Sequence, residues 1–283
     1  MNKPEVSVIF PAYNAERYLC EAIASILSQT FRNFELIIVD DGSADNTRSI
    51  IEDFAKKDLR IRPLFNERNR GVVESLNRAI DAAKGKYIAR MDHDDISMPE
   101  RLETQIRFLE EHPEISAVGS NVILIDDKGD TIGIRRLPET SEEIAQFLVL
   151  GNQLVHPTVM LRREVFDAVS KYKKVLHAED YHLWIEMVKK GLKLYNIQTP
   201  LMKYRMIDPH KVTITYKLRC GISTINLKLM AWRSINHKLS PFIFFINISK
   251  EVIWLLLYIL LPDSLFFKIY TYRVRAIYSG RDG

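Results

Sequence analysis

Apolar runs and helical patterns alternate through the first 115 residues, and this alternation most constrains the fold of the chain. Each apolar run is short enough for a buried strand, and each intervening segment places apolar residues three and four positions apart. The expected strands cover residues 6–12, 34–43, 61–66 and 86–92, and the expected helices cover 14–29, about 45–57, about 72–83 and a segment beginning at Pro99. Asn14 is expected to cap the first helix, and Ser43 or Asp45 the second. Such alternation favours a mostly parallel, Rossmann-like α/β sheet with helices on both faces.

The regular alternation of strands and helices ends after residue 115, where the sequence predicts shorter and less regular elements. They are a β-hairpin over 117–136 that turns at 127–129, a helix near 140–150, a strand over 158–163, a helix over 179–191, and two short strands over 193–198 and 201–206. Three apolar helical patterns then follow, over 217–235, 242–261 and 264–279. We therefore expect one α/β domain over residues 1–210 and a helical tail over 211–283.

Polar clusters follow three of the expected strands. They are Tyr13-Asn14, Asp40-Asp41-Gly42 and the acidic stretch 92–95. In open α/β sheets, ligands bind in the crevice beyond the carboxyl ends of the strands. The three clusters are therefore expected to meet at one edge of the sheet and to form a site there.

The acidic stretch contains Asp92, Asp94 and Asp95 directly after a buried strand. Asp92 and Asp94 are two positions apart, so their side chains point the same way in extended backbone. Paired carboxylates form a hard-oxygen site that suits Mg²⁺ or Mn²⁺. The alternative is a solvated loop in which Asp95 or Ser97 caps the next helix. An EF-hand is disfavoured, because the rest of its calcium-binding loop is missing.

The stretch "VDDGSADNT" over 39–47 reads as a tight turn from a strand to a helix. Gly42 would take the unusual backbone conformation, and one of the two preceding aspartates could accept hydrogen bonds from a nucleobase or a ribose. The chain has neither the G-x-G-x-x-G pattern after its first strand nor a G-x-x-x-x-G-K-[ST] pattern. Dinucleotide-binding and P-loop interpretations therefore lack their main support.

Four separated stretches occur in order: "VSVIFPAYNAERYLCEAIASILSQTFRNFELIIVDDGSADNT", "NRGVVESLNRAI", "GKYIARMDHDDISMPERLETQ" and "HAEDYHLW". They resemble the motifs of the family 2 inverting glycosyltransferases, and the resemblance spans about residues 5–205. It implies the nucleotide-sugar-binding GT-A fold and a divalent cation, Mn²⁺ or Mg²⁺. It also implies transfer of a sugar from a nucleoside diphosphate with inversion at the anomeric carbon. Uridine diphosphate is the usual nucleotide in this family, and guanosine and thymidine versions exist.

The resemblance assigns roles on the donor side of the site. Pro11 and Tyr13 match the motif that lines the nucleobase, Asp41 matches the residue that hydrogen-bonds the base, and Gly71 matches a glycine of the loop near the nucleotide. The acidic stretch matches the family's D-x-D pair. Asp92 would face the ribose or the metal, Asp94 would bind the metal, and Asp95 could share either role.

On the acceptor side, Asp180 matches the catalytic base, with its neighbour Glu179 as the alternative. Inversion by direct displacement needs a base for the acceptor hydroxyl and a cation that stabilises the departing diphosphate, which agrees with this assignment. Acidic residues that merely complement a helix N-terminus are the structural alternative for both carboxylates. His156 either lines the acceptor side or belongs to the core.

Other activities fit the sequence less well. The chain lacks the Q-x-x-R-W pattern and the multi-span tail of the processive synthases in this family, which favours addition of a single sugar. A sugar-nucleotide pyrophosphorylase would carry a glycine-rich loop after the first strand, where this chain has "PAYNAER". A non-catalytic nucleotide-sugar-binding protein remains open, although the complete set Asp92, Asp94 and Asp180 argues against it.

The tail differs from the body in charge. Residues 203–283 carry 13 Lys and Arg against four Asp and Glu, whereas residues 1–202 carry 27 against 32. A basic tail can bind nucleic acid or an anionic membrane surface, and the apolar content of this one favours the membrane over nucleic acid. Basic residues flank its apolar stretch: Lys211, Lys217, Arg219, Lys228, Arg233, Lys238, Lys268, Arg273 and Arg275.

The twenty residues 242–261 are long enough to span a bilayer, but Lys250 and Glu251 lie at their middle. Because charges there oppose insertion, helices lying on the membrane are favoured over a span or over packing on the body. The two cysteines form no disulfide pattern, and the N-terminus resembles no signal peptide. We therefore expect a cytoplasmic protein bound peripherally to the inner face of the cell membrane, acting on a glycan acceptor that is lipid-linked, as in the assembly of O-antigen, capsule or other cell-surface polysaccharide.

Overall fold

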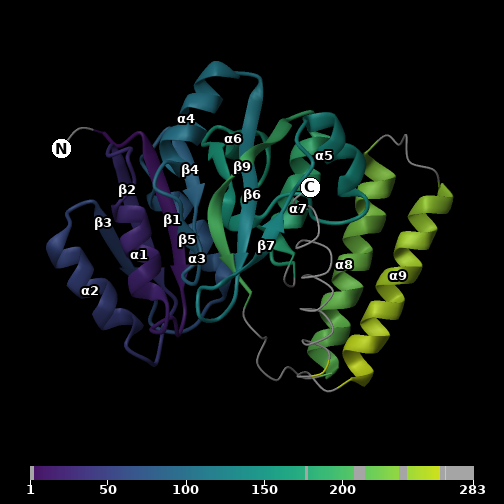
Figure 1. Ribbon diagram of the computed structural model, residues 1–283, viewed down its shortest axis with the longest axis horizontal. Coiled ribbons are helices and arrows are strands. Elements are labelled where there is room, and N and C mark those ends of the chain that lie inside the picture. The colour runs from purple at the N-terminus through teal and green to yellow at the C-terminus, as the bar shows by residue number, and fades with distance from the viewer. Residues whose placement is uncertain (1–2, 176–177, 207–213, 236–240, 262–264, 266–283) are drawn as a thin grey trace.

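The computed structural model describes residues 3–175, 178–206, 214–235, 241–261 and 265 (Figure 1). Its centre is a nine-stranded sheet in the order β3-β2-β1-β4-β8-β6-β9-β5, with β7 paired to β6 outside that path. Helices cover both faces of this sheet, and two long helices stand beside one end of it. The predicted α/β class is confirmed.

The first four strands are those expected from the apolar runs. They are β1 (Val6–Ala12), β2 (Phe34–Asp40), β3 (Ile61–Phe65) and β4 (Tyr87–Arg90). All pair in parallel, with β1 between β2 and β4. Their carboxyl ends consequently lie at one edge, and the polar clusters that follow β1, β2 and β4 are brought together there.

The second half of the sheet is mixed. It consists of β5 (Ile96–Ser97), β6 (Ile115–Ile125), β7 (Thr131–Arg135), β8 (Met160–Arg162) and β9 (Lys193–Arg205). β8 is antiparallel to both β4 and β6, and β6 and β7 form the expected hairpin. The two short strands expected near residue 200 form the single strand β9, whose parallel pairing with β6 shifts register between Ile197 and Met202. Pro200 lies in that gap, and a proline cannot donate a ladder hydrogen bond.

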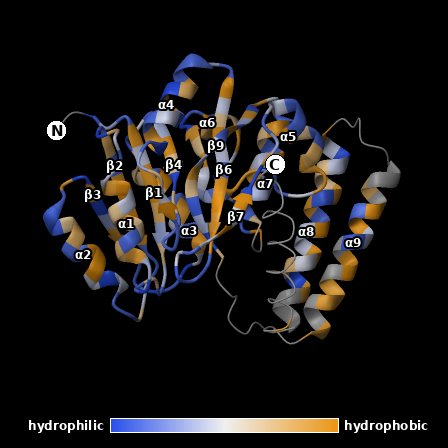
Figure 2. Cartoon of the chain, viewed as in Figure 1, coloured by the Kyte–Doolittle hydropathy of each residue, from blue (hydrophilic) through white to orange (hydrophobic). Residues whose placement is uncertain are grey.

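The helices that pack on the sheet form two apolar layers, one on each of its faces (Figure 2). One layer receives α1 (Leu19–Leu27), α2 (Thr47–Lys57) and α4 (Arg101–Glu111). The other receives α3 (Val72–Ala82), α5 (Ser141–Leu148), α6 (Val165–Ala168) and α7 (Glu179–Lys189), and a 3₁₀ turn over His156–Thr158 precedes β8. Along β1, Val8 and Phe10 pack in the first layer and Ile9 in the second, as the alternation of a strand requires.

The predicted cap of the first helix is wrong. Asn14 has a φ of 47° and α1 begins only at Leu19. The Asn14 backbone N–H donates to the Ser43 hydroxyl (3.0 Å), and its side-chain oxygen accepts from the backbone N–H of Ala44 (3.0 Å). Asparagine tolerates this left-handed conformation better than most residues. Asn14 therefore ties the end of β1 to the turn after β2. The predicted cap of the second helix is wrong as well, because the N-cap of α2 is Asn46 and not Ser43 or Asp45, although Asp45 accepts the Thr47 N–H.

Two long helices, α8 (Ile214–Ser234) and α9 (Pro241–Leu260), pack against each other. The inner side of this pair joins the apolar layer of α5 and α7, because Leu227, Ala231, Ile235 and Phe244 are buried in it. No helix among the described residues has both the length and the apolar character needed to cross a bilayer. The helix expected over 264–279 lies outside the described residues, apart from Leu265.

The structure corrects one of the basic residues assigned to the flank of the tail. Lys228 is only 1% exposed, and its ammonium donates to Oδ1 of Asn247 on α9 at 2.8 Å. Arg219 and Arg233 are exposed, as expected for basic residues at the edge of an apolar surface. The side chains of the remaining six, Lys211, Lys217, Lys238, Lys268, Arg273 and Arg275, lie outside the described part of the chain.

Candidate active site

A cleft of about 590 Å³ opens at the carboxyl ends of β1, β2 and β4. Six residues predicted for the site line it: Pro11, Tyr13, Asp41, Gly71, Asp92 and Glu179. The wall also contains His93, Arg70 and Lys174, which the sequence did not single out. The three clusters that follow separate strands thus meet as predicted.

The turn after β2 depends on Gly42. Its φ is 72°, and a Cβ built there would lie 2.6 Å from the backbone carbon of Arg68. Asp40 accepts hydrogen bonds from both the backbone N–H and the hydroxyl of Ser43, which closes the turn. A residue larger than glycine at position 42 would therefore push the 66–71 loop away from the cleft.

Asp41 organises the wall of the cleft. Its Oδ1 accepts from the side-chain amide of Asn66 (2.6 Å) and from the backbone N–H of Arg70 (3.0 Å), and its Oδ2 accepts from the N–H of Gly71 (2.8 Å). Gly71 has a φ of 90° and immediately precedes α3. Asp41 thus fixes the loop at which α3 begins, in addition to the contact with a nucleobase that the sequence predicts for it.

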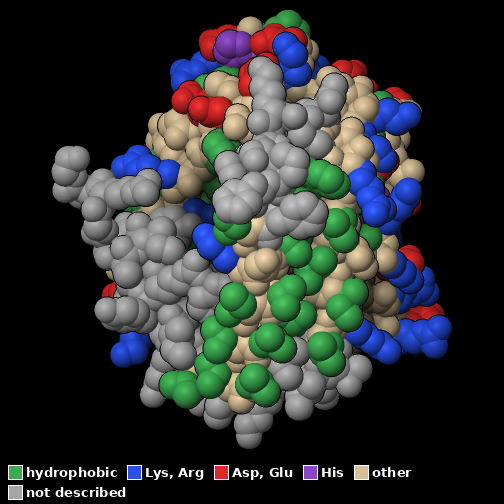
Figure 3. Space-filling model, turned by 90° about the vertical axis from the view of Figure 1, so that its right-hand side faces the viewer, with side chains coloured by type: hydrophobic (Ala, Val, Ile, Leu, Met, Phe, Trp, Pro, Cys, Tyr) green, Lys and Arg blue, Asp and Glu red, His purple; other side chains and the backbone are tan. Residues whose placement is uncertain are grey.

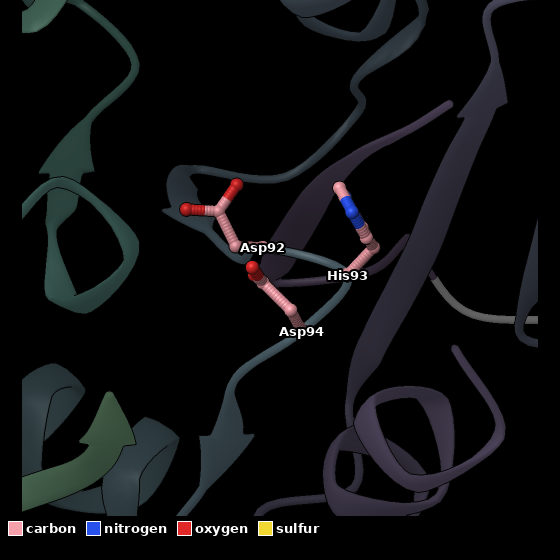
Figure 4. Close-up of side chains that lie close together, drawn as sticks. All are labelled: Asp92, His93 and Asp94. Atoms are coloured by element: carbon pink, nitrogen blue, oxygen red, sulfur yellow. The ribbon is translucent and has the colours of Figure 1, made fainter. Parts of the chain in front are cut away.

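The acidic stretch forms a group that suits a cation. One ligand atom each of Asp92, His93 and Asp94 lies within 4.8 Å of the others, and the three side chains project from the loop after β4 (Figure 4). His93 is an addition to the predicted ligands. Asp95 stands apart from this group, because it is buried and its Oδ1 accepts the backbone N–H of Arg205 (2.8 Å).

The charges in the loop after β4 also favour a bound cation. Burial, and then the neighbouring Asp92 charge, raises the pKa of Asp94. Burial followed by the charges of Asp94 and Asp92 raises the pKa of Asp95 well above its usual value. Arg90 forms an ion pair with Asp92, and this pairing raises the pKa of Arg90 although burial alone would lower it. Crowded carboxylates fit Mn²⁺ or Mg²⁺, since a cation would relieve their repulsion.

Arg205, at the end of β9, holds this loop in place and was missed from the sequence. Its Nε donates to the backbone oxygen of Asp94 (2.8 Å), and its guanidinium also reaches the backbone oxygen of Asp126 (3.1 Å) and a carboxylate oxygen of Glu21 (2.7 Å). These contacts join Arg205 to segments more than 70 residues away in the sequence. Local sequence patterns therefore could not predict them.

Glu179 and Asp180 begin α7 on the other side of the site. Asp180 is partly buried; its Oδ2 accepts from the side-chain amide of Asn152 (2.6 Å) and its Oδ1 from the N–H of Tyr181 (2.7 Å). Burial, and then the charge of Glu179, raises the pKa of Asp180 to about 6. Burial also raises the pKa of Glu179, the member of the pair that lines the cleft.

His156 lies in the core beneath the site. It is 8% exposed, its Nε2 is 2.8 Å from the hydroxyl of Tyr172, and its ring meets the edge of Trp184. Burial lowers the pKa of His156 well below its usual value, so the imidazole is neutral. Of the two alternatives for this residue, the structure shows the core.

Comparison with known proteins identifies the family. The model of Glycosyl transferase family 2 matches residues 7–170, more than half of the chain. The chain belongs to glycosyltransferase family 2. This family 2 chain is 35% identical over 254 residues to glycosyltransferase EpsE of Bacillus subtilis (strain 168), covering 88% of each protein. It is 34% identical over 203 residues to the amylovoran biosynthesis glycosyltransferase AmsE of Erwinia amylovora, covering 70% of this chain and 75% of AmsE.

Solved structures share the fold at lower identity. Residues 1–349 of S. aureus TarS in complex with UDP match with a TM-score of 0.63 and 20% identity, covering 88% of this chain and 70% of that one. The mannosyltransferase PcManGT from Pyrobaculum calidifontis, in complex with GDP-Man and Mn²⁺, matches with a TM-score of 0.60 and 18% identity, covering 100% and 77%. The predicted family and its GT-A fold are confirmed for this family 2 glycosyltransferase.

Proposed function

We propose that this glycosyltransferase moves a single sugar from a UDP-sugar to a glycan acceptor, with inversion at the anomeric carbon and with a divalent cation. The observation that carries the proposal is one cleft lined both by Asp92 and His93 and by Glu179. Displacement at the anomeric carbon needs negative charge stabilised on the leaving diphosphate and a proton removed from the acceptor. Asp92 and His93 could hold the cation that stabilises the diphosphate, and Glu179 is a carboxylate that could accept the proton.

On the donor side, Pro11, Tyr13, Asp41 and Gly71 would hold the nucleotide, because all four line the cleft. Asp92, Asp94 and His93 would hold Mn²⁺ or Mg²⁺, which would act as a Lewis acid toward the diphosphate. Asp95 would support this group from behind rather than bind the ion, because it hydrogen-bonds Arg205.

On the acceptor side, we assign the base to Asp180. A pKa of about 6 keeps most of this carboxylate ionised at neutral pH while leaving it basic enough to receive a proton. Glu179 is the alternative base, because it lines the cleft. Asp180→Asn should reduce turnover by roughly 10²–10⁴-fold with donor binding retained, whereas Glu179→Gln should have a much smaller effect. A larger loss in Glu179→Gln would transfer the role to Glu179.

The donor is tested directly. Thermal unfolding and release of nucleoside diphosphate should be measured with UDP-glucose, UDP-galactose, UDP-N-acetylglucosamine and GDP-mannose, each with and without Mn²⁺. One UDP-sugar should raise the unfolding temperature, and only when Mn²⁺ is present. Stabilisation by none of the four in either condition would contradict the assigned donor site.

We infer that the acceptor is a lipid-linked glycan in the synthesis of a cell-surface polysaccharide, at the cytoplasmic face of the membrane. The AmsE name supports the polysaccharide, because it places that relative in amylovoran biosynthesis. Apolar side chains gather on the outer face of α8 and α9, with Lys and Arg beside them (Figure 3), which supports docking on an anionic membrane. In this proposal residues 1–210 carry catalysis and 211–283 carry attachment.

A further inference from the structure

We propose that Asn152 is a positioning residue that orients the Asp180 carboxylate through a hydrogen bond to its Oδ2, and that α8 supports the loop carrying Asn152. The proposal rests on the proposed role of Asp180 as the base. It gives the C-terminal helices a second task besides attachment, because they would lie behind the catalytic machinery.

The side-chain amide of Asn152 is fixed from both ends. Its oxygen accepts the backbone N–H of Leu154 (3.2 Å), which turns its NH₂ group toward Oδ2 of Asp180 at 2.6 Å. Oδ1 of Asp180 meanwhile accepts the N–H of Tyr181. Each carboxylate oxygen therefore receives one hydrogen bond, and both bonds favour the charged form.

The loop that carries Asn152 rests on α8. A Cβ built on Gly151 would lie 3.9 Å from Cε of Lys228, whose ammonium bonds to Asn247 of α9. Leu154, two residues after Asn152, is buried in the same apolar cluster as Leu227 of α8. The loop thus lies beside the partly buried Lys228–Asn247 pair of the C-terminal helices and shares one apolar cluster with α8.

Several charges surround Asp180, and Asn152 supplies a neutral side-chain donor beside the backbone N–H of Tyr181. Glu179 on the same helix and burial raise the pKa of Asp180, whereas Arg90 of β4 lowers it. The Tyr172 hydroxyl, in the segment before α7, faces the same region and has its own pKa raised by burial. Removal of the Asn152 amide would leave burial and Glu179 less opposed, so the pKa of Asp180 would rise further.

Residue Gln153 provides a matched control in the same loop. Its side-chain amide donates to the backbone oxygens of Phe147 (2.9 Å) and Gly151 (2.9 Å), and Asp180 is not among its partners. Gln153→Ala removes hydrogen bonds that shape the loop but leaves the bond to Asp180 intact.

The test measures the pKa of Asp180 by carboxyl ¹³C NMR titration of the full chain, with Asp180→Asn identifying the resonance. Asn152→Ala should raise this pKa by about one unit, the effect of one hydrogen bond to a charged group. Asn152→Asp keeps the side-chain shape and adds a negative charge, so it should raise the pKa further. Gln153→Ala should leave the pKa unchanged. Equal titration of the wild type, Asn152→Ala and Asn152→Asp would overturn the proposal.

Activity provides the functional readout and separates this proposal from the one it rests on. The rate of UDP release from the best UDP-sugar of the donor panel should be measured against pH at saturating Mn²⁺. As the pH is lowered, this rate should begin to fall at a higher pH in Asn152→Ala than in Gln153→Ala. Full turnover in Asp180→Asn would contradict both the assignment of Asp180 as the base and the positioning role of Asn152. Asp180→Asn could instead lose turnover while Asn152→Ala and Gln153→Ala show the same fall in rate at acidic pH. That result would contradict the positioning role of Asn152 alone.

Discussion

At the scale of single residues, the loop after β4 separates Asp94, which the family resemblance assigns to the metal, from Asp95, to which that resemblance left either role. Asp94 belongs to the group that suits a cation, whereas Asp95 is 1% exposed and turns to the backbone of Arg205. Both follow the same strand and have the same chemistry, so only the three-dimensional partners assign different tasks to them. This difference can be measured.

Asp94→Asn and Asp95→Asn should therefore have different effects. Asp94→Asn removes a charge from the cation group and should raise the Mn²⁺ concentration needed for half-maximal donor stabilisation at least tenfold. Asp95→Asn removes a buried like charge, so it should raise the unfolding temperature without Mn²⁺ by roughly 2–4 °C and change the Mn²⁺ requirement little. Calorimetric unfolding across a Mn²⁺ series measures both. An equal Mn²⁺ shift in the two variants would show that Asp95 also binds the ion.

At the scale of elements, strands β1 to β4 and most helices could be predicted, because apolar periodicity is a local property of the sequence. The cap at Asn14 could not, since its partners lie on the turn after β2, about 30 residues away. The role of Arg205 could not either, because it acts across 110 residues on Asp95. The predicted members of the cleft came from strand ends and motif resemblance, whereas the residues that support them are tertiary partners with no pattern of their own.

Arg205 joins the end of β9 to the cation loop, which predicts a specific loss on mutation. Arg205→Ala should raise the Mn²⁺ requirement several-fold as well as lower stability, because the loop loses the donor to the backbone oxygen of Asp94. Arg162 is the control: it donates to backbone oxygens of Ile115 (2.9 Å) and His112 (3.3 Å), outside the cleft residues. Arg162→Ala should lower stability and leave the Mn²⁺ requirement unchanged. The same Mn²⁺ dependence in both variants would reduce Arg205 to a structural role.

At the scale of the whole molecule, α8 and α9 have two different faces. The inner face shares the apolar layer of α7, and the outer face exposes Ile222 (52%), Ile253 (56%) and Leu256 (51%). Deletion of the tail would consequently uncover the core as well as remove the proposed membrane contact. Substitutions on the outer face are the cleaner test of attachment.

The double variant Ile253→Asp, Leu256→Asp should bind vesicles containing phosphatidylglycerol at least tenfold more weakly, because it places charge where apolar contact is proposed. Leu59→Asp is the control, since Leu59 is 75% exposed just before β3. It should bind like the wild type, and both variants should unfold at the wild-type temperature. Unchanged binding in cosedimentation of the double variant would contradict attachment through this face.

The place of β9 within the sheet also matters for incomplete chains. The match to the family model ends at residue 170, before Asp180 and before β9, which lies between β6 and β5. A chain stopped soon after that point would keep every residue proposed for the donor side but would leave an unpaired edge along β6. Early termination should therefore yield a product that aggregates or is degraded, and not a stable remnant that sequesters sugar nucleotides without using them.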